Sequence, residues 1–320
     1  MRMRAGLRGI TLSVVASALT LATVATAAVV VSAAPAGAVP LPVGTIVQGA
    51  LAEIFSPEST PPGMNNWSCV PSAAHPYPVI LVHGTVVNEA LSWQALSPEL
   101  VNAGYCVYGF NYGEGPASVN RVDGESDIAT SAEQLATFIF YVLTATKAAQ
   151  VDIVGHSQGG MMPRYAMKYL GDGPKVHMLV GLAPSNHGTT LDSSAPFLAV
   201  LHGLGLNVFN LIGCISCTQQ VNGQGQSVIA NLNAGGETVP GVQYVVIESR
   251  YDEVVTPYTS AFLNDPGVQN ILLQDQCPLD FSEHIGIIYD PVALQDVMNA
   301  LGPDDPSFQP ACSFVPPGIG

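Results

Sequence analysis

Basic residues are scarce in this 320-residue chain. It contains nine Lys and Arg against 24 Asp and Glu, so its formal net charge is −15 with histidines neutral. Such a balance disfavours nucleic acid and anionic membrane surfaces as partners, because both are bound through basic side chains. Charged residues of either sign make up only 10% of the sequence. We therefore expect a lightly charged, acidic surface around a large apolar core.

The chain begins with a segment that is first basic and then apolar. Residues 1–8 contain three arginines, and an apolar run follows over 10–31. Ala36-Gly37-Ala38 resembles the small-residue site at which a secretory signal is cleaved. We predict a signal peptide over 1–38 and a secreted, extracellular protein. The run is longer than most signal cores, so an uncleaved membrane anchor is the alternative, and the A-x-A pattern favours cleavage.

The predicted exported chain, 39–320, holds six basic and 24 acidic residues, a net charge of −18 with histidines neutral. No later segment is apolar enough to cross a bilayer without interruption, so we expect no stable membrane span. An internal repeat is also missing, and a chain of this length suits one domain with a sizeable core. We expect a single domain and a monomer.

All six cysteines lie in the exported part: Cys69, Cys106, Cys214, Cys217, Cys277 and Cys312. An even number in an exported protein indicates three disulfides, although six cysteines allow 15 pairings. We predict the sequential set, Cys69–Cys106, Cys214–Cys217 and Cys277–Cys312. The C-x-x-C motif at 214–217 has a redox or zinc site as its alternative, but the sequence lacks a second such motif to support it.

Strands and helices alternate along the chain after an irregular segment, 39–74. Strands are predicted at Val79–Val82, Tyr105–Phe110, Val151–Val154, Val176–Leu182, Val242–Ile247 and Asn270–Leu273. Helices are predicted at Leu91–Ala103, Ile128–Thr146, Gly159–Leu170 and Pro291–Leu301. This alternation is typical of an α/β protein whose mostly parallel central sheet carries helices on both faces.

The most specific motif is Gly155-His156-Ser157-Gln158-Gly159, between a predicted strand and a predicted helix. In that context G-x-S-x-G is the nucleophile elbow of the α/β-hydrolase fold. Gly155 and Gly159 have no side chains to collide in the sharp turn. The helix directs its free N–H groups and positive dipole end toward developing negative charge. We predict that Ser157 is a nucleophile; a Gly-rich turn with an incidental serine is the alternative.

A serine nucleophile needs a base, and in this fold the acid and then the histidine follow the serine. Of seven histidines, only His284 lies beyond the strand 242–247, after which the acid is expected. Asp252 fits best as the acid, because it lies in the loop directly after that strand and has apolar neighbours. Glu253 is its nearest rival. The other carboxylates in this region are Glu248, Asp265, Asp275, Asp280 and Glu283.

A tetrahedral oxyanion is stabilised by hydrogen-bond donors placed around it, and in this fold two backbone N–H groups are expected. One is expected from Gln158, the residue after the nucleophile, and the other from the loop His83-Gly84-Thr85 after strand 79–82. Gly84 lets the backbone approach a substrate, and Thr85 offers its N–H and its hydroxyl. His83 and His156 flank this region, and we expect them to pack and form hydrogen bonds there.

These motifs resemble those of secreted bacterial class 2 lipases. The likeness extends over 154–165, 183–189, 251–255 and 280–286, and covers nearly all of Cys69–Leu301. Such lipases are in turn similar to the fungal lipase B type, which has a threonine and a glutamine in the oxyanion hole. The resemblance implies the triad Ser157, Asp252 and His284, with Thr85 and Gln158 as oxyanion donors. It also implies carboxylic esters with fatty acyl chains as substrates.

An apolar segment, 195–213, lies within a predicted insertion at about 186–239. It either walls an acyl-chain pocket or forms a mobile lid at a lipid surface. An ordinary helix buried against the sheet is an equal alternative, because several glycines blur its hydrophobic period.

The sequence therefore favours a secreted serine carboxylic ester hydrolase, with triacylglycerol lipase as the leading activity and a lipid–water interface as its place of action. Nothing in it implies a metal or an organic cofactor. One alternative is a short-chain or polymer esterase, or an acyltransferase, on the same triad. Another is a secreted binding protein without catalysis, against which the intact triad argues.

Overall fold

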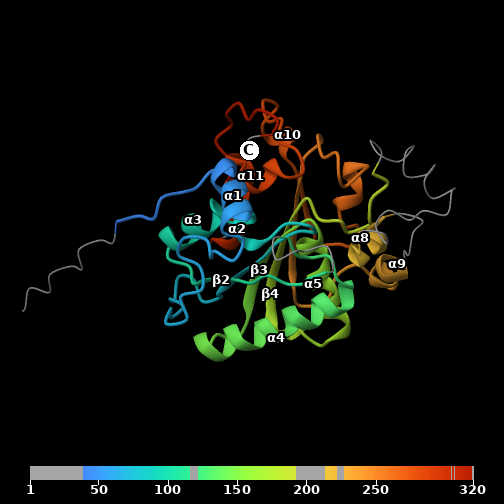
Figure 1. Ribbon diagram of the computed structural model, residues 1–320, viewed down its shortest axis with the longest axis horizontal. Helices are drawn as coiled ribbons and strands as arrows, with labels where there is room; N and C mark the ends of the chain where they lie inside the picture. The colour runs from blue at the N-terminus through green and yellow to red at the C-terminus, as the bar shows by residue number, and fades with distance from the viewer. Residues whose placement is uncertain are drawn as a thin grey trace, which may run out of the picture. The chain divides into compact units, whose positions relative to one another are not determined.

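Six parallel strands form the central sheet of the computed structural model, which describes residues 39–115, 122–191, 213–221, 227–303, 305 and 307–318 (Figure 1). The strands are β1 (Val79–Val82), β2 (Val107–Gly109), β3 (Val151–His156), β4 (Val176–Leu182), β5 (Gln243–Glu248) and β6 (Gln269–Leu272). Their order across the sheet is β2-β1-β3-β4-β5-β6, and every neighbouring pair is parallel. The sheet is thus parallel, as predicted, and the carboxyl ends of its strands lie at one edge.

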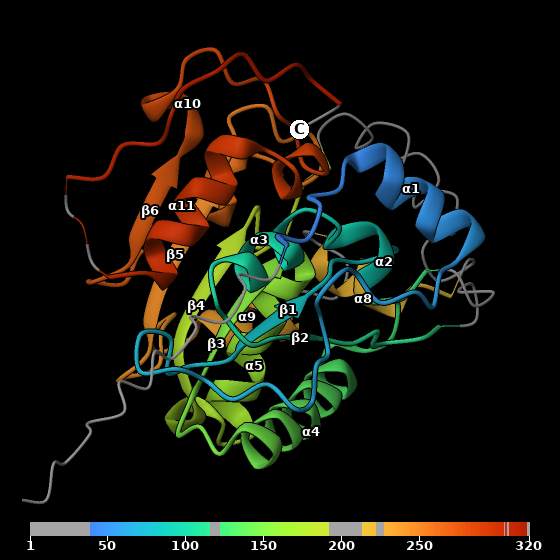
Figure 2. The same ribbon diagram turned by 90° about the vertical axis from the view of Figure 1, so that its left-hand side faces the viewer.

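Helices cover both faces of this sheet (Figure 2). One face carries α4 (Ile128–Thr146) and α5 (Gln158–Tyr169). The other carries α1 (Ile46–Phe55), α2 (Glu89–Ser92), α3 (Leu96–Asn102) and α11 (Pro291–Leu301). The shorter elements are α8 (Ile215–Gln220), α9 (Ser227–Asn233), α10 (Leu273–Gln276) and the 3₁₀ turns η1 (Gly173–Lys175), η2 (Tyr258–Ala261) and η3 (Gly286–Ile288).

Alternate residues of the buried strands supply two separate cores. In β1, Val79 and Leu81 belong to the core on the α11 side, whereas Ile80 and Val82 belong to the core on the α4 side. All four side chains are fully buried. Successive side chains of a strand point to opposite faces, so a sheet covered on both sides needs continuous apolar runs. This is why such runs predicted the strands.

Two local predictions were wrong. The segment 39–74, predicted to be irregular, contains α1, because Thr45 and Gln48 form a capping box that satisfies N–H groups at its start. The single helix predicted over Leu91–Ala103 is divided into α2 and α3. Pro98 explains the division: its ring would clash with a carbonyl one turn earlier inside a continuous helix, but is tolerated in the first turn of α3.

Among the described residues, α4 alone is long and apolar enough to cross a membrane, with 19 residues and a hydropathy of 1.2. We predicted that no segment after the signal peptide is apolar enough to cross a bilayer, and by length and composition this prediction was wrong for α4. Ile128, Leu135, Ile139 and Val142 of α4 are fully buried in the core on its side of the sheet. A helix that contributes an apolar face to a core reaches this hydropathy without a bilayer.

Three disulfides connect the cysteines in the predicted pairs, Cys69–Cys106, Cys214–Cys217 and Cys277–Cys312. The first ties the segment before β1 to the residue before β2, the second closes the start of α8, and the third holds the tail beside α10. Pro40–Gly320 forms one compact unit. The predicted signal peptide and nearly all of the apolar segment 195–213 lie outside the described residues.

Candidate active site

Ser157 lies in a sharp turn between β3 and α5. Its backbone has φ 53° and ψ −122°, and a positive φ is strained for a residue with a side chain. A Cβ on Gly155 would lie 1.9 Å from the carbonyl oxygen of Gly159, and a Cβ on Gly159 would lie 2.1 Å from that of Val82. A side chain at either position would collide with the backbone, so both positions require glycine, as the elbow motif predicts.

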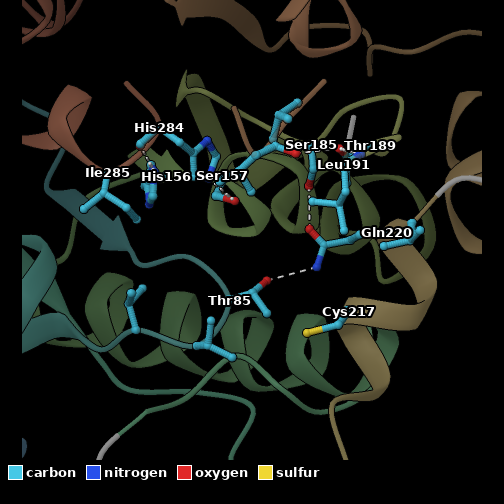
Figure 3. Close-up of a pocket in the computed structure, with 15 residues that line it drawn as sticks. Thr85, His156, Ser157, Ser185, Thr189, Leu191, Cys217, Gln220, His284 and Ile285 are labelled. Carbon is cyan, nitrogen blue, oxygen red and sulfur yellow. Dashed lines mark hydrogen bonds between the residues drawn. The ribbon is translucent and has the colours of Figure 1, made fainter. Parts of the chain in front are cut away.

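His284 and Asp252 continue a line of contacts that starts at Ser157. His284 Nε2 is 3.0 Å from Ser157 Oγ, and His284 Nδ1 is 2.7 Å from Asp252 Oδ2. The three side chains come from the turn after β3, the loop after β5 and the loop before α11, and all are buried. Figure 3 shows His284 beside Ser157 at one end of a pocket. The structure thus brings together three residues that the sequence separates by 127 and 32 positions.

Asp252 is held as an ionised carboxylate. Burial by itself raises its pKa, but the charge and hydrogen bond of His284 oppose burial. The backbone N–H groups of Val255 and Val254 add to this by donating to Asp252 Oδ1 at 2.7 and 2.8 Å. The net result is a pKa below the ordinary value. Glu253, the rival acid in the sequence, is exposed.

Two further histidines support the loops around Ser157. His156 Nε2 donates to the backbone carbonyl of His284, and His83 Nδ1 donates to that of Gly84, both at 2.8 Å, since a carbonyl can only accept. Burial lowers the pKa of His156 to about 3 and that of His83 to about 4. Both rings therefore stay neutral and serve the packing and hydrogen-bonding role predicted for them.

Thr85 and Gln158, the predicted oxyanion donors, are joined by Gln220 of α8. Thr85 Oγ1 donates to Gln158 Oε1 at 2.8 Å. Gln220 Nε2 lies 2.9 Å from Thr85 Oγ1, and Ser185 Oγ donates to Gln220 Oε1 at 2.7 Å (Figure 3). Gln220 Nε2 also lies 2.7 Å from Gln158 Oε1. Sequence analysis missed Gln220, because no motif marks it and 135 positions separate it from Thr85. Ser185 lies in the stretch 183–189 that resembles class 2 lipases, but no role was predicted for it.

A pocket of about 230 Å³ opens beside Ser157. Its polar groups include Thr85, Gln220 and His284. Apolar side chains from several loops complete its wall: Val86, Val87, Leu191, Val221, Val254 and Ile285. A mostly apolar cavity with a few convergent polar groups is the usual form of a small-molecule site.

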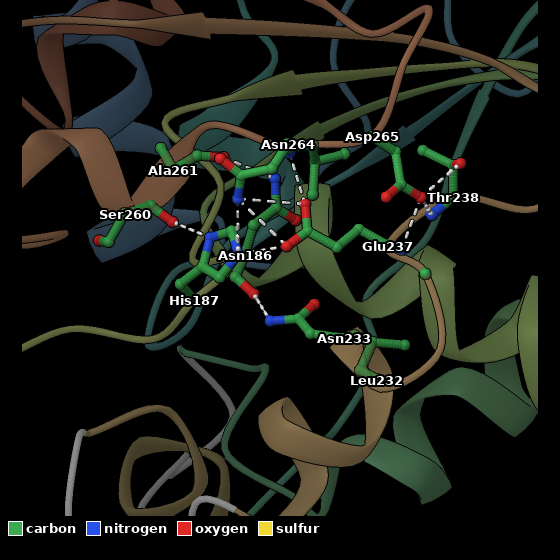
Figure 4. Close-up of polar contacts among 12 residues, drawn as sticks. Asn186, His187, Leu232, Asn233, Glu237, Thr238, Ser260, Ala261, Asn264 and Asp265 are labelled. Carbon is green, nitrogen blue, oxygen red and sulfur yellow. Dashed lines mark hydrogen bonds and ion pairs between the residues drawn. The ribbon is translucent and has the colours of Figure 1, made fainter.

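A polar cluster connects the two ends of the predicted insertion (Figure 4), and Arg164 ties it to the elbow helix. Arg164 of α5 is fully buried and donates to Asn186 Oδ1, Asn233 Oδ1 and the Glu237 carbonyl. The Glu237 carboxylate contacts His187 Nε2 at 2.7 Å. Burial lowers the pKa of Arg164 to about 10, so it remains a cation at neutral pH. The insertion thus leaves and rejoins the sheet at a point tied to α5.

Asp280 and Asp290 form a buried pair beside the His284 loop. Ser282 Oγ is 2.6 Å from Asp290 Oδ2 and 2.8 Å from Asp280 Oδ1, and its one hydrogen can be donated to only one of them. Burial and then the contact with Asp280 raise the pKa of Asp290 from 3.8 to about 7. The folded protein therefore keeps a proton that the unfolded chain releases near pH 4.

This raised pKa predicts that the free energy of unfolding falls as the pH rises from about 4 to about 7, because unfolding then releases the Asp290 proton. One such group contributes at most about 1.4 kcal/mol for each pH unit. Asp290→Asn should make the dependence shallower, because an asparagine side chain releases no proton in this pH range. The fold should persist, since the amide oxygen can still accept the Val292 N–H that caps α11. Urea unfolding across this pH range measures the slope. The exposed control Glu133→Gln should leave it unchanged, and an unaltered slope in Asp290→Asn would contradict the assignment.

The sequence matches the family model of Lipase (class 2) over residues 76–296. Triacylglycerol lipases of Pseudarthrobacter phenanthrenivorans and Burkholderia plantarii are each 35% identical to it over 103 residues, or 29% of this chain. The chain covers only 28% and 25% of the lengths of these two relatives.

Solved structures show the same fold. Aspergillus fumigatus lipase B matches with a TM-score of 0.59 and 25% identity, over 78% of this chain and 57% of that one. Mature Bacillus licheniformis lipase BlEst2 matches with a TM-score of 0.51 and 14% identity, over 73% of this chain and 94% of that one. With the parallel sheet, these likenesses confirm the α/β-hydrolase fold. Because the family model spans more than half of the chain, including Ser157, Asp252 and His284, the chain belongs to the class 2 lipase family.

Proposed function

We propose that this protein is a secreted carboxylic ester hydrolase that acts on triacylglycerols through a triad of Ser157, His284 and Asp252. The observation that carries the proposal is the unbroken line of contacts from Ser157 Oγ through His284 to Asp252, beside a largely apolar pocket. Membership of the class 2 lipase family supports the same activity.

In the first half of the reaction, His284 Nε2 accepts the hydroxyl proton of Ser157 while Ser157 Oγ attacks the ester carbonyl carbon. The tetrahedral intermediate collapses, the proton passes from His284 to the departing alcohol, and the acyl group stays on Ser157. A water molecule then attacks the acyl-enzyme in the same manner and releases the carboxylic acid. Asp252 keeps the hydrogen of the imidazole on Nδ1 and stabilises the imidazolium that forms in each half.

The backbone N–H groups of Thr85 and Gln158 bind the oxyanion of each tetrahedral intermediate. The positive end of α5 adds a favourable field at the same place. Gln220 supports these donors through its bonds to both side chains, so that little reorganisation is needed as the charge develops. Gln220 is in this respect a positioning residue.

Substrate class and compartment rest on separate observations. The apolar pocket wall suits an acyl chain, and the two relatives with 35% identity are named triacylglycerol lipase. Three disulfides agree with export, since such bonds persist in oxidising compartments. We assign 1–38 to a signal peptide and 39–320 to one catalytic domain that acts as a monomer.

A fluorophosphonate probe and a series of esters test this function together. The probe should label the exported chain once, and peptide mass spectrometry should place the label on Ser157, because only an activated serine attacks phosphorus readily. Hydrolysis of emulsified triacylglycerols should then be compared with that of soluble short-chain esters. Activity confined to the soluble esters would indicate an esterase. An unlabelled, folded protein would indicate a binding protein without catalysis.

A further inference from the structure

Glu248 is a second buried carboxyl group next to the proposed triad. It is the last residue of β5, and its side chain is fully buried. Its Oε1 accepts the backbone N–H of Ser249 at 2.8 Å. Its Oε2 is equally buried and receives no N–H or hydroxyl donor from the residues that the structure describes. The carboxyl groups of Glu248 and Asp252 are in hydrogen-bonding contact.

A hydrogen bond between two carboxyl groups requires a proton on one of them, because an ionised carboxylate can only accept. Asp252 is not the protonated partner. Its Oδ1 accepts two backbone N–H groups and its Oδ2 accepts from His284, and each of these contacts favours the ionised form. Glu248 has a single N–H donor. The proton therefore belongs on Glu248, and we assign it to Oε2 because Oε1 already accepts the Ser249 N–H.

Among the residues that the structure describes, no cation acts on Glu248 to hold it as a carboxylate. The titratable groups on the neighbouring elements are committed to other partners: His156, His284, Asp280 and Asp290. Arg250 is the nearest cation in the sequence, but it is half-exposed and lies 3.5 Å from the exposed Asp275. Burial and then the charge of Asp252 raise the pKa of Glu248 well above its ordinary value, in agreement with a neutral acid.

We propose that Glu248 is a neutral carboxylic acid that donates a hydrogen bond from Oε2–H to the Asp252 carboxylate, and that it is a positioning residue for the triad. The inference rests on the proposed function in naming the role of Asp252. The donated bond draws charge away from the oxygens that face His284. It thereby lowers the basicity of the imidazole and extends toward acid pH the range in which Nε2 is free to accept the Ser157 proton. The next residue, Ser249, ties the same segment to the His284 loop, because its Oγ donates to the Ser282 carbonyl at 2.6 Å.

Two substitutions separate a neutral donor from a buried charge. Glu248→Gln keeps the shape, the neutral charge and a donor, so it should leave the pKa of His284 unchanged. Glu248→Leu removes the donor, so Asp252 becomes a stronger base and the pKa of His284 should rise.

The measurements are NMR titration of the His284 ring and the pH dependence of kcat/KM on a soluble ester, with the exported chain. KM should stay the same in both variants, because Glu248 does not line the pocket. Glu253→Gln, which removes an exposed carboxylate beside Asp252, is the matched control for charge.

A fall of about one unit or more in the pKa of His284 in Glu248→Gln would overturn the proposal, because it would mean that a negative charge had been removed. An unchanged pKa in Glu248→Leu would also overturn it, because it would mean that Asp252 had lost no donor. If Glu248→Leu fails to fold, the infrared spectra of the wild type and of Glu248→Gln provide the test. The wild type must show the carbonyl band of a protonated carboxyl group that the variant lacks, and identical spectra in this region would overturn the proposal. Ring titration needs no catalysis. A wild type that titrates as expected but cleaves no ester would therefore contradict the proposed function and leave this inference standing.

Discussion

Ser157→Ala should abolish ester hydrolysis, with kcat lower by about five to six orders of magnitude. The substitution removes the protein atom that attacks the ester carbonyl in the proposed mechanism, so no acyl-enzyme can form. The oxyanion donors and the pocket remain, so a slow residual reaction with water is all that is expected. A steady-state assay with a soluble ester, supported by loss of fluorophosphonate labelling, measures the effect.

Ser185→Ala is the matched control for this experiment. Ser185 lines the same pocket and is buried, but it donates to Gln220 and makes no contact with His284. Its replacement should cost at most about tenfold in kcat, through a less firmly held Gln220. Both variants should keep the thermal unfolding temperature of the wild type within a few degrees. Retention of most activity in a folded Ser157→Ala protein would exclude the proposed mechanism.

Asp252→Asn should lower kcat by about four orders of magnitude while the fold persists. The structure supplies the reason. Because Val254 and Val255 donate to one side-chain oxygen, the amide oxygen of an asparagine must occupy that place. Its NH₂ group then faces His284 and forces the ring hydrogen from Nδ1 to Nε2. An Nε2 that carries a hydrogen cannot accept the proton of Ser157.

Glu253→Gln provides the comparison for Asp252→Asn. It removes the same charge one position away, but Glu253 is exposed, where water and salt screen a carboxylate. Its kcat should stay within about threefold of the wild type. The pH profile adds a second criterion, because only Asp252→Asn should change the titration of His284. The opposite ranking of the two variants would transfer the acid role to Glu253.

Short-range patterns were sufficient for most of the framework. The apolar run of β1 predicts a strand because a sheet covered on both faces buries every side chain. Gly155 and Gly159 predict the elbow because any Cβ there meets backbone within a few residues or in the adjacent strand. The errors at α1 and at Pro98 were also local: the capping box of Thr45 and Gln48 was overlooked, as was the steric effect of a proline within a predicted helix.

Chain order alone selected His284 for the candidate site, since the fold presents acid and histidine after the nucleophile. Asp252 was favoured over other carboxylates by its loop directly after the strand and by its apolar neighbours. Only the tertiary structure shows that Gln220 contacts Thr85. It also shows which carboxylates near β5 are buried, namely Glu248 and Asp252 but not Glu253. Glu248 and Glu253 look equally able to carry charge in the sequence, yet one lies in the core and the other in water. Such differences depend on how separate elements pack around a side chain, and desolvation, which sets the protonation state, has no local sequence pattern.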